Sequence, residues 1–237
     1  MTKEAYEIAG RACVTYYREG AQFLVVQPVD ENDLEVLDHQ VEVMKGEAEA
    51  AFILVAFKIR NWNEELSPWD APPVFGKQGF GHGAEDTLEF VTNALIPEVC
   101  RRYQLPETIP VILGGYSLAG LFSLWSAYQT DRFTAIAAAS PSVWFPGWRE
   151  YAEDHTPGAE YIYLSLGDKE EKAKNKVMAA VGDCIRAQYE GLKDGKAVKQ
   201  CVLEWNEGNH FKDSDIRCAK GFLWCMKEVH KGGALRC

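Results

Sequence analysis

A serine between two apolar segments is the residue of this chain best placed to do chemistry. Ser117 follows the largely apolar run 111–116 and precedes the segment 118–128, which is rich in helix formers. Gly115 and Ala119, two positions before and after the serine, are small enough to let a strand and a helix pass closely at a sharp turn. The pattern predicts a strand, a turn and a helix, with the Ser117 hydroxyl presented at the turn as a nucleophile.

Two other interpretations of these glycines are a phosphate-binding loop and an ordinary strand-to-helix turn with a surface serine. A Walker loop is excluded because no lysine follows the glycines, and the G-x-G-x-x-G pattern is absent as well. A nucleophile elbow usually carries glycine two residues after its serine, where this chain has Ala119, and a methyl group there is usually tolerated. The ordinary turn stays open as an alternative.

The elements that would position Ser117 can be predicted from apolar runs and from apolar residues at helical spacing. Strands are expected at 11–17, 23–26, 52–57, 111–116, 135–139, 161–167 and 198–205, and helices at 34–46, 84–103, 118–128, 174–193 and from about 213 onward. Pro28 is expected to end the strand 23–26, and Pro97 to kink the helix 84–103. The alternation predicts a single α/β domain over residues 1–237, with a mainly parallel twisted sheet and helices on both faces.

Partners for the serine are expected at the carboxyl ends of other strands, because functional groups gather at that edge of an open parallel sheet. Asp168, Glu170 and Glu171 follow one later strand, and His210 follows the last. A serine hydroxyl is a poor nucleophile until a histidine takes its proton, and the histidine needs an acid to hold its tautomer. The order serine, acid, histidine is the order found in α/β-hydrolases.

The choice of base and of acid stays open on these residues alone. His82, in a glycine-rich loop, is the alternative base, whereas the three other histidines lie in a polar helix, beside a Pro-Gly turn and near the C-terminus. Asp168, Glu170 and Glu171 compete as the acid. An acidic turn after a strand is commonly no more than a solvated surface feature.

Four segments together resemble the putative-esterase branch of the α/β-hydrolases, which includes enterochelin esterases and S-formylglutathione hydrolase-like enzymes. The segments are 115–122, 138–144, 166–170 and 208–210, and the similarity extends from about residue 23 to the C-terminus. The resemblance implies the α/β-hydrolase fold, Ser117 as nucleophile and His210 as base. The Gly-x-x-acid turn of the family falls on residues 167–170 and implies Glu170 as the acid. No metal or cofactor is implied.

Side-chain length also favours Glu170 over Asp168. Asp168 directly follows Gly167 at the end of a strand, where a short side chain can cap the turn. Glu170 lies two residues further along and has a longer side chain that can reach the ring of His210.

The oxyanion hole is expected to use two backbone N–H groups. The first belongs to Leu118, the residue after the nucleophile, and the second to the loop after the strand 23–26, at about Val29 or Asp30. That loop lacks the His-Gly pair that the family often carries.

Residues 60–83 form a long irregular stretch that contains Trp62 and Trp69. A loop of this length inside a compact domain is usually functional or disordered, and the tryptophans argue against disorder. We expect Trp62, Trp69 and Trp144 to wall a substrate pocket. The alternative for the loop is a packed surface loop with structural aromatic residues, and the alternative for the three tryptophans is that they are core residues.

Composition narrows the class of protein. The 237 residues carry a net charge of −10 without a basic cluster, which argues against nucleic acid as a partner. The apolar runs have the length of strands, far short of a membrane span, and the N-terminus lacks the apolar core of a signal peptide. The odd number of cysteines without metal-ligand spacing favours reduced thiols in the cytoplasm. These cysteines are Cys13, Cys100, Cys184, Cys201, Cys218, Cys225 and Cys237.

The sequence thus predicts a cytoplasmic serine esterase that cleaves a small-molecule carboxylic ester through an acyl-enzyme. The same groups would serve a thioesterase, an acyltransferase or a peptidase. A hydrolase fold without activity, used as a binding module, is the alternative from another class. The oligomeric state is not predicted.

Overall fold

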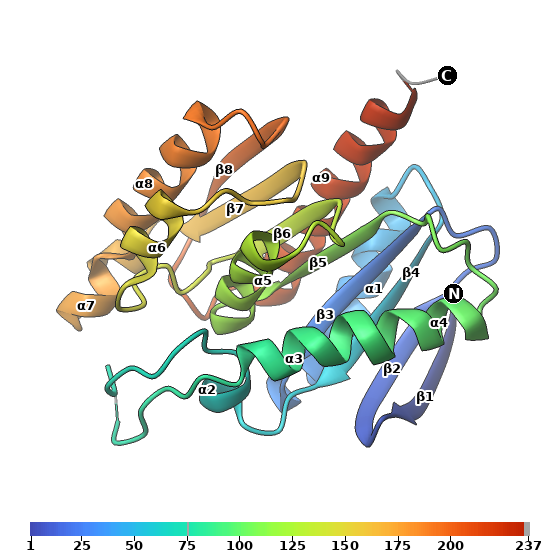
Figure 1. Ribbon diagram of the computed structural model, residues 1–237, viewed down its shortest axis with the longest axis horizontal. Helices are drawn as coiled ribbons and strands as arrows, with labels where there is room; N and C mark the ends of the chain where they lie inside the picture. Colours follow the sequence, from blue (N-terminus) through green and yellow to red (C-terminus); the bar gives the residue numbers. More distant parts are fainter. Residues whose placement is uncertain (75, 235–237) are drawn as a thin grey trace.

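The computed structural model describes residues 1–74 and 76–234, so that Cys237 lies outside the described part (Figure 1). Within it, eight strands form one sheet in the order β1-β2-β4-β3-β5-β6-β7-β8. The strands are β1 (Thr2–Ile8), β2 (Arg11–Tyr17), β3 (Phe23–Val29), β4 (Phe52–Lys58), β5 (Val111–Tyr116), β6 (Ala135–Ala139), β7 (Tyr161–Gly167) and β8 (Gln200–Asn206). Neighbours from β4 to β8 are parallel, whereas β1 pairs with β2, and β2 with β4, in antiparallel fashion.

Helices cover both faces of this sheet (Figure 1). On one face lie α1 (Glu31–Glu47) and α9 (Ser214–Ala234), which pack against each other. The other face carries α3 (Ala84–Phe90), α4 (Ile96–Arg102), α5 (Leu118–Gln129), α6 (Trp148–Asp154) and α8 (Val181–Asp194). The shorter elements are α2 (Trp62–Glu65), α7 (Lys176–Ala179), the π-helical turn η1 (Val91–Leu95) and the 3-10 turn η2 (Glu170–Lys172). The predicted mainly parallel sheet with helices on both faces is confirmed.

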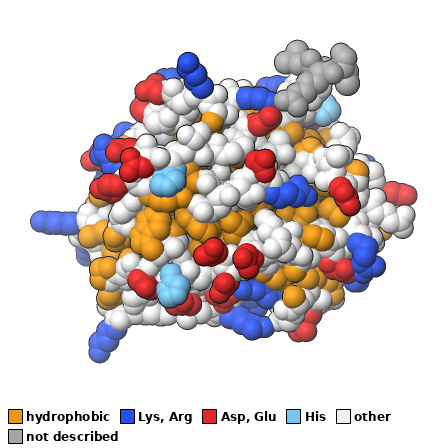
Figure 2. Space-filling view, viewed as in Figure 1, with side chains coloured by type: hydrophobic (Ala, Val, Ile, Leu, Met, Phe, Trp, Pro, Cys, Tyr) orange, Lys and Arg blue, Asp and Glu red, His pale blue; other side chains and the backbone are white. Residues whose placement is uncertain are grey.

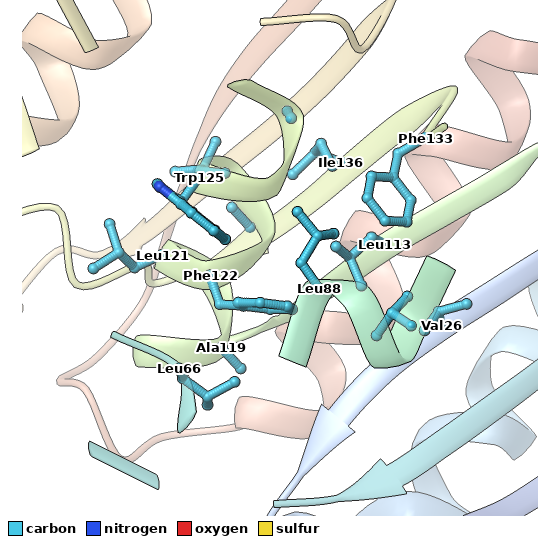
Figure 3. Close-up of a cluster of buried hydrophobic side chains, with 14 of the residues drawn as sticks. Val26, Leu66, Leu88, Leu113, Ala119, Leu121, Phe122, Trp125, Phe133 and Ile136 are labelled. Atoms are coloured by element: carbon cyan, nitrogen blue, oxygen red, sulfur yellow. The ribbon is translucent and has the colours of Figure 1, made fainter. Parts of the chain in front are cut away.

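Two buried clusters fill the space between the sheet and its helical layers, because alternate residues of each strand point to opposite faces. On β3, Leu24 and Val26 face one cluster, and Val25 faces the other. Figure 3 shows the first cluster, where Phe122 of α5 and Leu88 of α3 lie close to the sheet. Burial on both faces explains why these strands read as continuous apolar runs. In the described residues no helix has both the length and the apolar character needed to cross a bilayer.

β3 runs to Val29, so the expected end of this strand at Val26 is wrong. Leu24 donates its N–H to the Pro110 carbonyl on the β5 side, and the alternation of the backbone puts the Pro28 nitrogen on that side too. The pairing with β5 has already stopped at Val26, so the missing N–H of Pro28 removes no ladder bond. By the same alternation, the N–H of Val29 points toward β4.

Other departures from the expected elements have local causes. The polar strand β1 was not expected, because its alternation of Lys, Glu and Tyr gives no apolar run, and it pairs with β2 through a left-handed turn at Ala9 and Gly10. The helix expected at 84–103 is interrupted by the π-helical turn η1, which ends two residues before Pro97 of α4. A wide turn there accommodates a residue that lacks the N–H for the helical ladder.

Candidate active site

The turn at Ser117 is tight and strained. Ser117 has φ 57° and ψ −119°, a backbone conformation that non-glycine residues rarely adopt. A methyl group on Gly115 would lie 2.6 Å from Cβ of Ala119, and one on Gly120 would lie 3.1 Å from the carbonyl oxygen of Gly115. The close approach of β5 and α5 therefore requires small residues, and the predicted strand, turn and helix around Ser117 are confirmed.

Ser117, His210 and Glu170 form a continuous chain of hydrogen bonds. Oγ of Ser117 lies 3.0 Å from Nε2 of His210, and Nδ1 of His210 lies 2.7 Å from Oε2 of Glu170. A neutral imidazole satisfies both contacts when Nδ1–H donates to the carboxylate and Nε2 accepts from the hydroxyl. The His210 side chain is 23% exposed and the Glu170 side chain 4%, so the chain runs from a solvent-accessible ring to a buried carboxylate.

The three residues meet because they follow neighbouring parallel strands. Ser117 follows β5, Glu170 lies in η2 after β7, and His210 lies in the loop between β8 and α9. β6 and β7 separate β5 from β8 in the sheet, and all four strands end at the same edge. This is the arrangement that the order of the residues along the chain predicted.

Several donors form hydrogen bonds to the carboxylate of Glu170. Its Oε1 accepts from the Gly167 N–H at 2.7 Å, from Oγ of Ser140 at 2.8 Å and from Nη1 of Arg217 at 2.9 Å. Burial raises the pKa of the Glu170 carboxyl, whereas the hydrogen bond and charge of His210 and the hydrogen bonds from Gly167 and Ser140 lower it. The net pKa lies below the ordinary glutamate value, so that Glu170 is an anion at neutral pH.

The two competing acids have other partners. Oδ1 of Asp168 accepts from the Gly208 N–H at 2.7 Å, and the Asp168 N–H donates to the Asn206 carbonyl at 2.8 Å. Asp168 thus joins the ends of β7 and β8. Glu171 pairs with Arg186 at 2.8 Å. Neither carboxylate is the one hydrogen-bonded to His210.

The alternative base has an acidic partner of its own. His82 is exposed, and its Nδ1 lies 3.1 Å from Oδ1 of Asp70 in the loop before α3. His39 of α1 pairs with Asp215 of α9 at 2.6 Å. His210 is the histidine in hydrogen-bond contact with Ser117.

The expected oxyanion donors differ in their surroundings. Leu118 is the first residue of α5, so its N–H has no carbonyl of an earlier helical turn to bind. Val29 is the last residue of β3 and lies in no loop, which corrects its expected position, and its N–H points toward β4. The Asp30 N–H lies 3.2 Å from Oδ2 of Asp33, and the Asp33 N–H donates back to Asp30 at 2.8 Å. This capping box begins α1, and it occupies the N–H of Asp30.

Aromatic residues connect the long loop 60–83 with the segment 142–146, which begins in contact with Ser117. Ser142 donates its N–H to the Ser117 carbonyl at 3.0 Å, and its Oγ lies 3.4 Å from Oγ of Ser117. Trp144 follows closely, and its ring meets that of Phe80 edge-on at 6.1 Å. Nε1 of Trp69 donates to the Pro146 carbonyl at 2.8 Å. The loop therefore folds back over the segment that adjoins the serine.

Trp62 and Trp144 are both half-buried, and both pack against the first core cluster. Trp144 lies two residues after Ser142 and so adjoins the site, whereas Trp62 begins α2 and has its described contacts with the core. Figure 2 shows hydrophobic side chains gathered between α6 and the loop before α3.

Sequence reasoning missed Arg217, which lies 1% exposed in the first turn of α9. Nη1 of Arg217 donates to the Tyr116 hydroxyl at 3.0 Å, to Ser140 at 3.1 Å and to Glu170 at 2.9 Å. One signal was available: the buried Cys218, Phe222 and Cys225 mark the inner face of this helix, and the arginine precedes that stripe. An arginine beside the buried face of a helix is seldom buried itself unless another group pairs with its charge.

Comparisons with known proteins agree on the fold and the family. Residues 35–194 match the model of the esterase family described as "Putative esterase". Curated proteins gave no match. The chain is similar to the IroE-like serine hydrolase from Shewanella oneidensis, with a TM-score of 0.79 and 18% identity over 95% of this chain and 80% of that one.

Two further solved structures have the same fold. The siderophore hydrolase EstA from Aspergillus nidulans gives a TM-score of 0.77 at 16% identity, covering 95% of this chain and 94% of that one. The enterobactin esterase FES from Shigella flexneri gives 0.68 at 14% identity, covering 96% of this chain and 59% of that one. The family match spans most of the chain and includes Ser117 and Glu170, and the protein therefore belongs to the putative-esterase family of the α/β-hydrolase superfamily and is an esterase.

Proposed function

We propose that this esterase is a serine hydrolase that cleaves a small-molecule carboxylic ester through Ser117, His210 and Glu170. The observation that carries the proposal is the unbroken hydrogen-bond chain from the Ser117 hydroxyl through the His210 ring to the Glu170 carboxylate, at 3.0 Å and 2.7 Å. A hydroxyl, an imidazole and a carboxylate in this order activate a serine for attack on a carbonyl.

In the first half of the reaction, Oγ of Ser117 attacks the ester carbonyl carbon while its proton passes to Nε2 of His210. Glu170 stabilises the imidazolium that results. The carbonyl oxygen becomes an oxyanion, which we expect the N–H of Leu118, the first residue of α5, to bind. His210 then gives its proton to the leaving alkoxide oxygen, the tetrahedral intermediate collapses, and the acyl group remains on Ser117 as an ester.

In the second half, a water molecule takes the place of the alcohol. Nε2 of His210 accepts a proton from the water, whose oxygen attacks the acyl carbon. Collapse of this second intermediate breaks the bond to Ser117, and His210 returns the proton to Oγ. The products are the carboxylic acid and the free enzyme, so that atoms and charge balance over the cycle.

The substrate class is inferred from the surroundings of the base and from the relatives. Phe211 is 89% exposed, and its ring stands edge-on to the His210 ring with centroids 5.6 Å apart. An exposed aromatic ring beside a catalytic base offers a surface for an aromatic or extended apolar group of the substrate. Two of the similar structures are described as a siderophore hydrolase and an enterobactin esterase. We therefore propose an ester that carries an aromatic group, as does the 2,3-dihydroxy-N-benzoyl-glycine present in the enterobactin esterase structure.

A fluorophosphonate probe tests the central proposal, because it reacts quickly only with an activated serine. We expect rapid labelling of Ser117, found by peptide mapping, and no labelling of the Ser117→Ala variant. Ser126→Ala is the matched control, since Ser126 lies in the same helix and donates only to the Phe122 carbonyl. An unlabelled wild-type protein with normal folding would overturn Ser117 as an activated nucleophile.

A further inference from the structure

Arg217 contributes a buried positive charge to the back of the site. Its side chain is 2% exposed, and it pairs with a Glu170 side chain that is 4% exposed. Among the described residues, the ion pairs of Glu170 are those with His210 and Arg217. The active state requires a neutral His210, because only a neutral ring accepts the serine proton. In that state Arg217 supplies the full opposite charge in contact with Glu170.

A buried carboxylate without an opposite charge is costly, and it responds by taking up a proton. In this site the proton would be shared by Glu170 and His210, which are joined at 2.7 Å. A ring that holds this proton cannot accept another from Ser117. The charge of Arg217 therefore favours the form of the pair in which Glu170 is an anion and His210 is neutral.

The same guanidinium also fixes the segments that carry the reacting groups. Nη2 of Arg217 donates to the carbonyls of Glu207 at 3.2 Å and Asn209 at 3.0 Å, in the loop that ends at His210. Nη1 donates to the Tyr116 hydroxyl, which itself donates to the His210 carbonyl at 2.8 Å. Because Tyr116 directly precedes Ser117, the Arg217 side chain connects β5, which leads to the nucleophile, with the loop that carries the base.

We propose, resting on the function proposed above, that Arg217 is a positioning residue that keeps His210 in its neutral, proton-accepting form. It does so by neutralising Glu170 and by holding the His210 loop against β5. It does not touch the substrate or the reacting atoms.

The charged and titratable groups around Arg217 come from each element packed against it. They are Tyr116 of β5, Glu170 of η2, His210 of the loop before α9, Asp215 and Cys218 of α9, and Asp33 of α1, which faces Cys218. Burial raises the pKa of the Tyr116 phenol and of the Cys218 thiol, so both stay neutral. Burial and the charge of Asp30 raise the pKa of Asp33 to about 7, which makes Asp33 the group whose titration must be controlled.

The test compares the pH dependence of kcat/KM in wild type, Arg217→Met and Arg217→Lys, each also in an Asp33→Asn background. Loss of an opposite charge in contact shifts a titration by about one to three pH units. We expect the acidic limb of the Arg217→Met profile to move upward by about that amount, so that the rate at neutral pH falls at least ~10-fold and recovers as the pH rises. Arg217→Lys keeps the charge, and we expect it to restore the wild-type limb.

Arg186→Met is the matched control, because it removes a surface arginine that pairs with Glu171, next to Glu170. We expect the wild-type profile from this control. A uniform fall in the rate of Arg217→Met with an unmoved limb would overturn the inference, as would an equal shift in Arg217→Lys. Fluorophosphonate labelling of wild type separates the two proposals: a labelled, active enzyme with an unmoved limb overturns only the role of Arg217.

Arg217→Met leaves the Glu170 charge buried and unpaired, so the variant can fail to fold. Arg217→Gln then carries the test, because its amide carries no charge and can still donate a hydrogen bond to Oε1 of Glu170. We expect its acidic limb to move upward in the same direction as that of Arg217→Met. An unmoved limb in Arg217→Gln would contradict the role of the Arg217 charge.

Discussion

Asp168 and Gly208 are joined by a hydrogen bond of 2.7 Å between the Asp168 carboxylate and the Gly208 N–H. This contact links the ends of β7 and β8, the two strands that precede Glu170 and His210. Gly208 has φ 109°, so the loop makes a turn there that other residues would resist. The distance between acid and base is thus fixed by a carboxylate that is not bound to the histidine.

The two carboxylates after β7 are therefore expected to respond differently to mutation. Glu170→Gln should lower kcat by roughly 10⁴, the cost of removing the acid of a serine-protease triad. It should also lower the thermal midpoint of unfolding, because it leaves the Arg217 charge buried without its partner. Asp168→Asn should lower the thermal midpoint of unfolding and leave kcat within about tenfold, because the amide keeps an acceptor for Gly208. Steady-state kinetics and thermal unfolding of both variants check this. A dead Asp168→Asn enzyme with an active Glu170→Gln enzyme would exchange the two roles.

Replacing the nucleophile should remove activity and spare the fold. We expect Ser117→Ala to lose on the order of 10⁶ in kcat on an activated ester, because serine and histidine act as a unit. Alanine fits the space of serine at this turn, so the thermal midpoint should stay close to that of wild type. Turnover by the variant at a wild-type rate would exclude Ser117 as the nucleophile.

The base can be assigned by comparing two histidines. His210→Ala should abolish hydrolysis, since it removes the group that accepts the Ser117 proton, whereas His82→Ala should retain it, since His82 is exposed and bound to Asp70. Rates on one ester and fluorophosphonate labelling of both variants give the answer. If His82→Ala alone lost both hydrolysis and labelling, His82 of the long loop would be the base.

The residues that we propose to react could be predicted from the sequence because they leave local signals. Ser117 lies between an apolar run and a helical segment and is flanked by Gly115 and Ala119, and His210 follows the last strand. A parallel sheet brings such positions to one edge whatever the packing elsewhere. The order of residues along the chain therefore predicted that Ser117, an acidic turn and His210 meet at one edge, whereas the choice of Glu170 within that turn depended on side-chain length and on the resemblance to the family.

The supporting residues could not be predicted in this way because their roles depend on contacts across the fold. Arg217 pairs with Glu170 only after α9 packs against the sheet, and the apolar stripe that follows Arg217 in the sequence does not indicate which residue is its partner. Asp30 was assigned to a loop, although it begins a helix through its reciprocal bonds with Asp33. An acidic residue three positions after another is common on surfaces, so this capping box was not distinguished from a solvated turn.

Phe211 offers a test of the substrate class. If its exposed ring contacts an aromatic group of the substrate, Phe211→Ala should raise KM for an aryl ester about fivefold, corresponding to ~1 kcal/mol for an aromatic pair, and should change KM for an acetate much less. Val177→Ala is the control, since Val177 is another exposed large hydrophobic residue. Equal effects on the two esters would argue against an aromatic contact at this position.

The capping box of α1 should make the stability of the protein depend on pH near neutrality. Burial, together with the charge of Asp30, raises the pKa of Asp33 to about 7, above the ordinary aspartate value of about 3.9. Between these two values the folded protein binds the Asp33 proton and the unfolded chain has released it. Folding is therefore favoured at the acidic end of this range, and the free energy of unfolding should fall as the pH rises toward 7.

Asp33→Asn isolates this contribution because an amide does not titrate and can still accept from the Asp30 N–H. We expect denaturant unfolding of this variant to show a smaller decline in stability between about pH 4 and pH 7 than wild type shows. Asp183→Asn is the matched control, because Asp183 lies exposed in the first turn of α8. The same decline in wild type and Asp33→Asn would mean that Asp33 is already ionised well below pH 7, and that α1 begins with two charged carboxylates side by side.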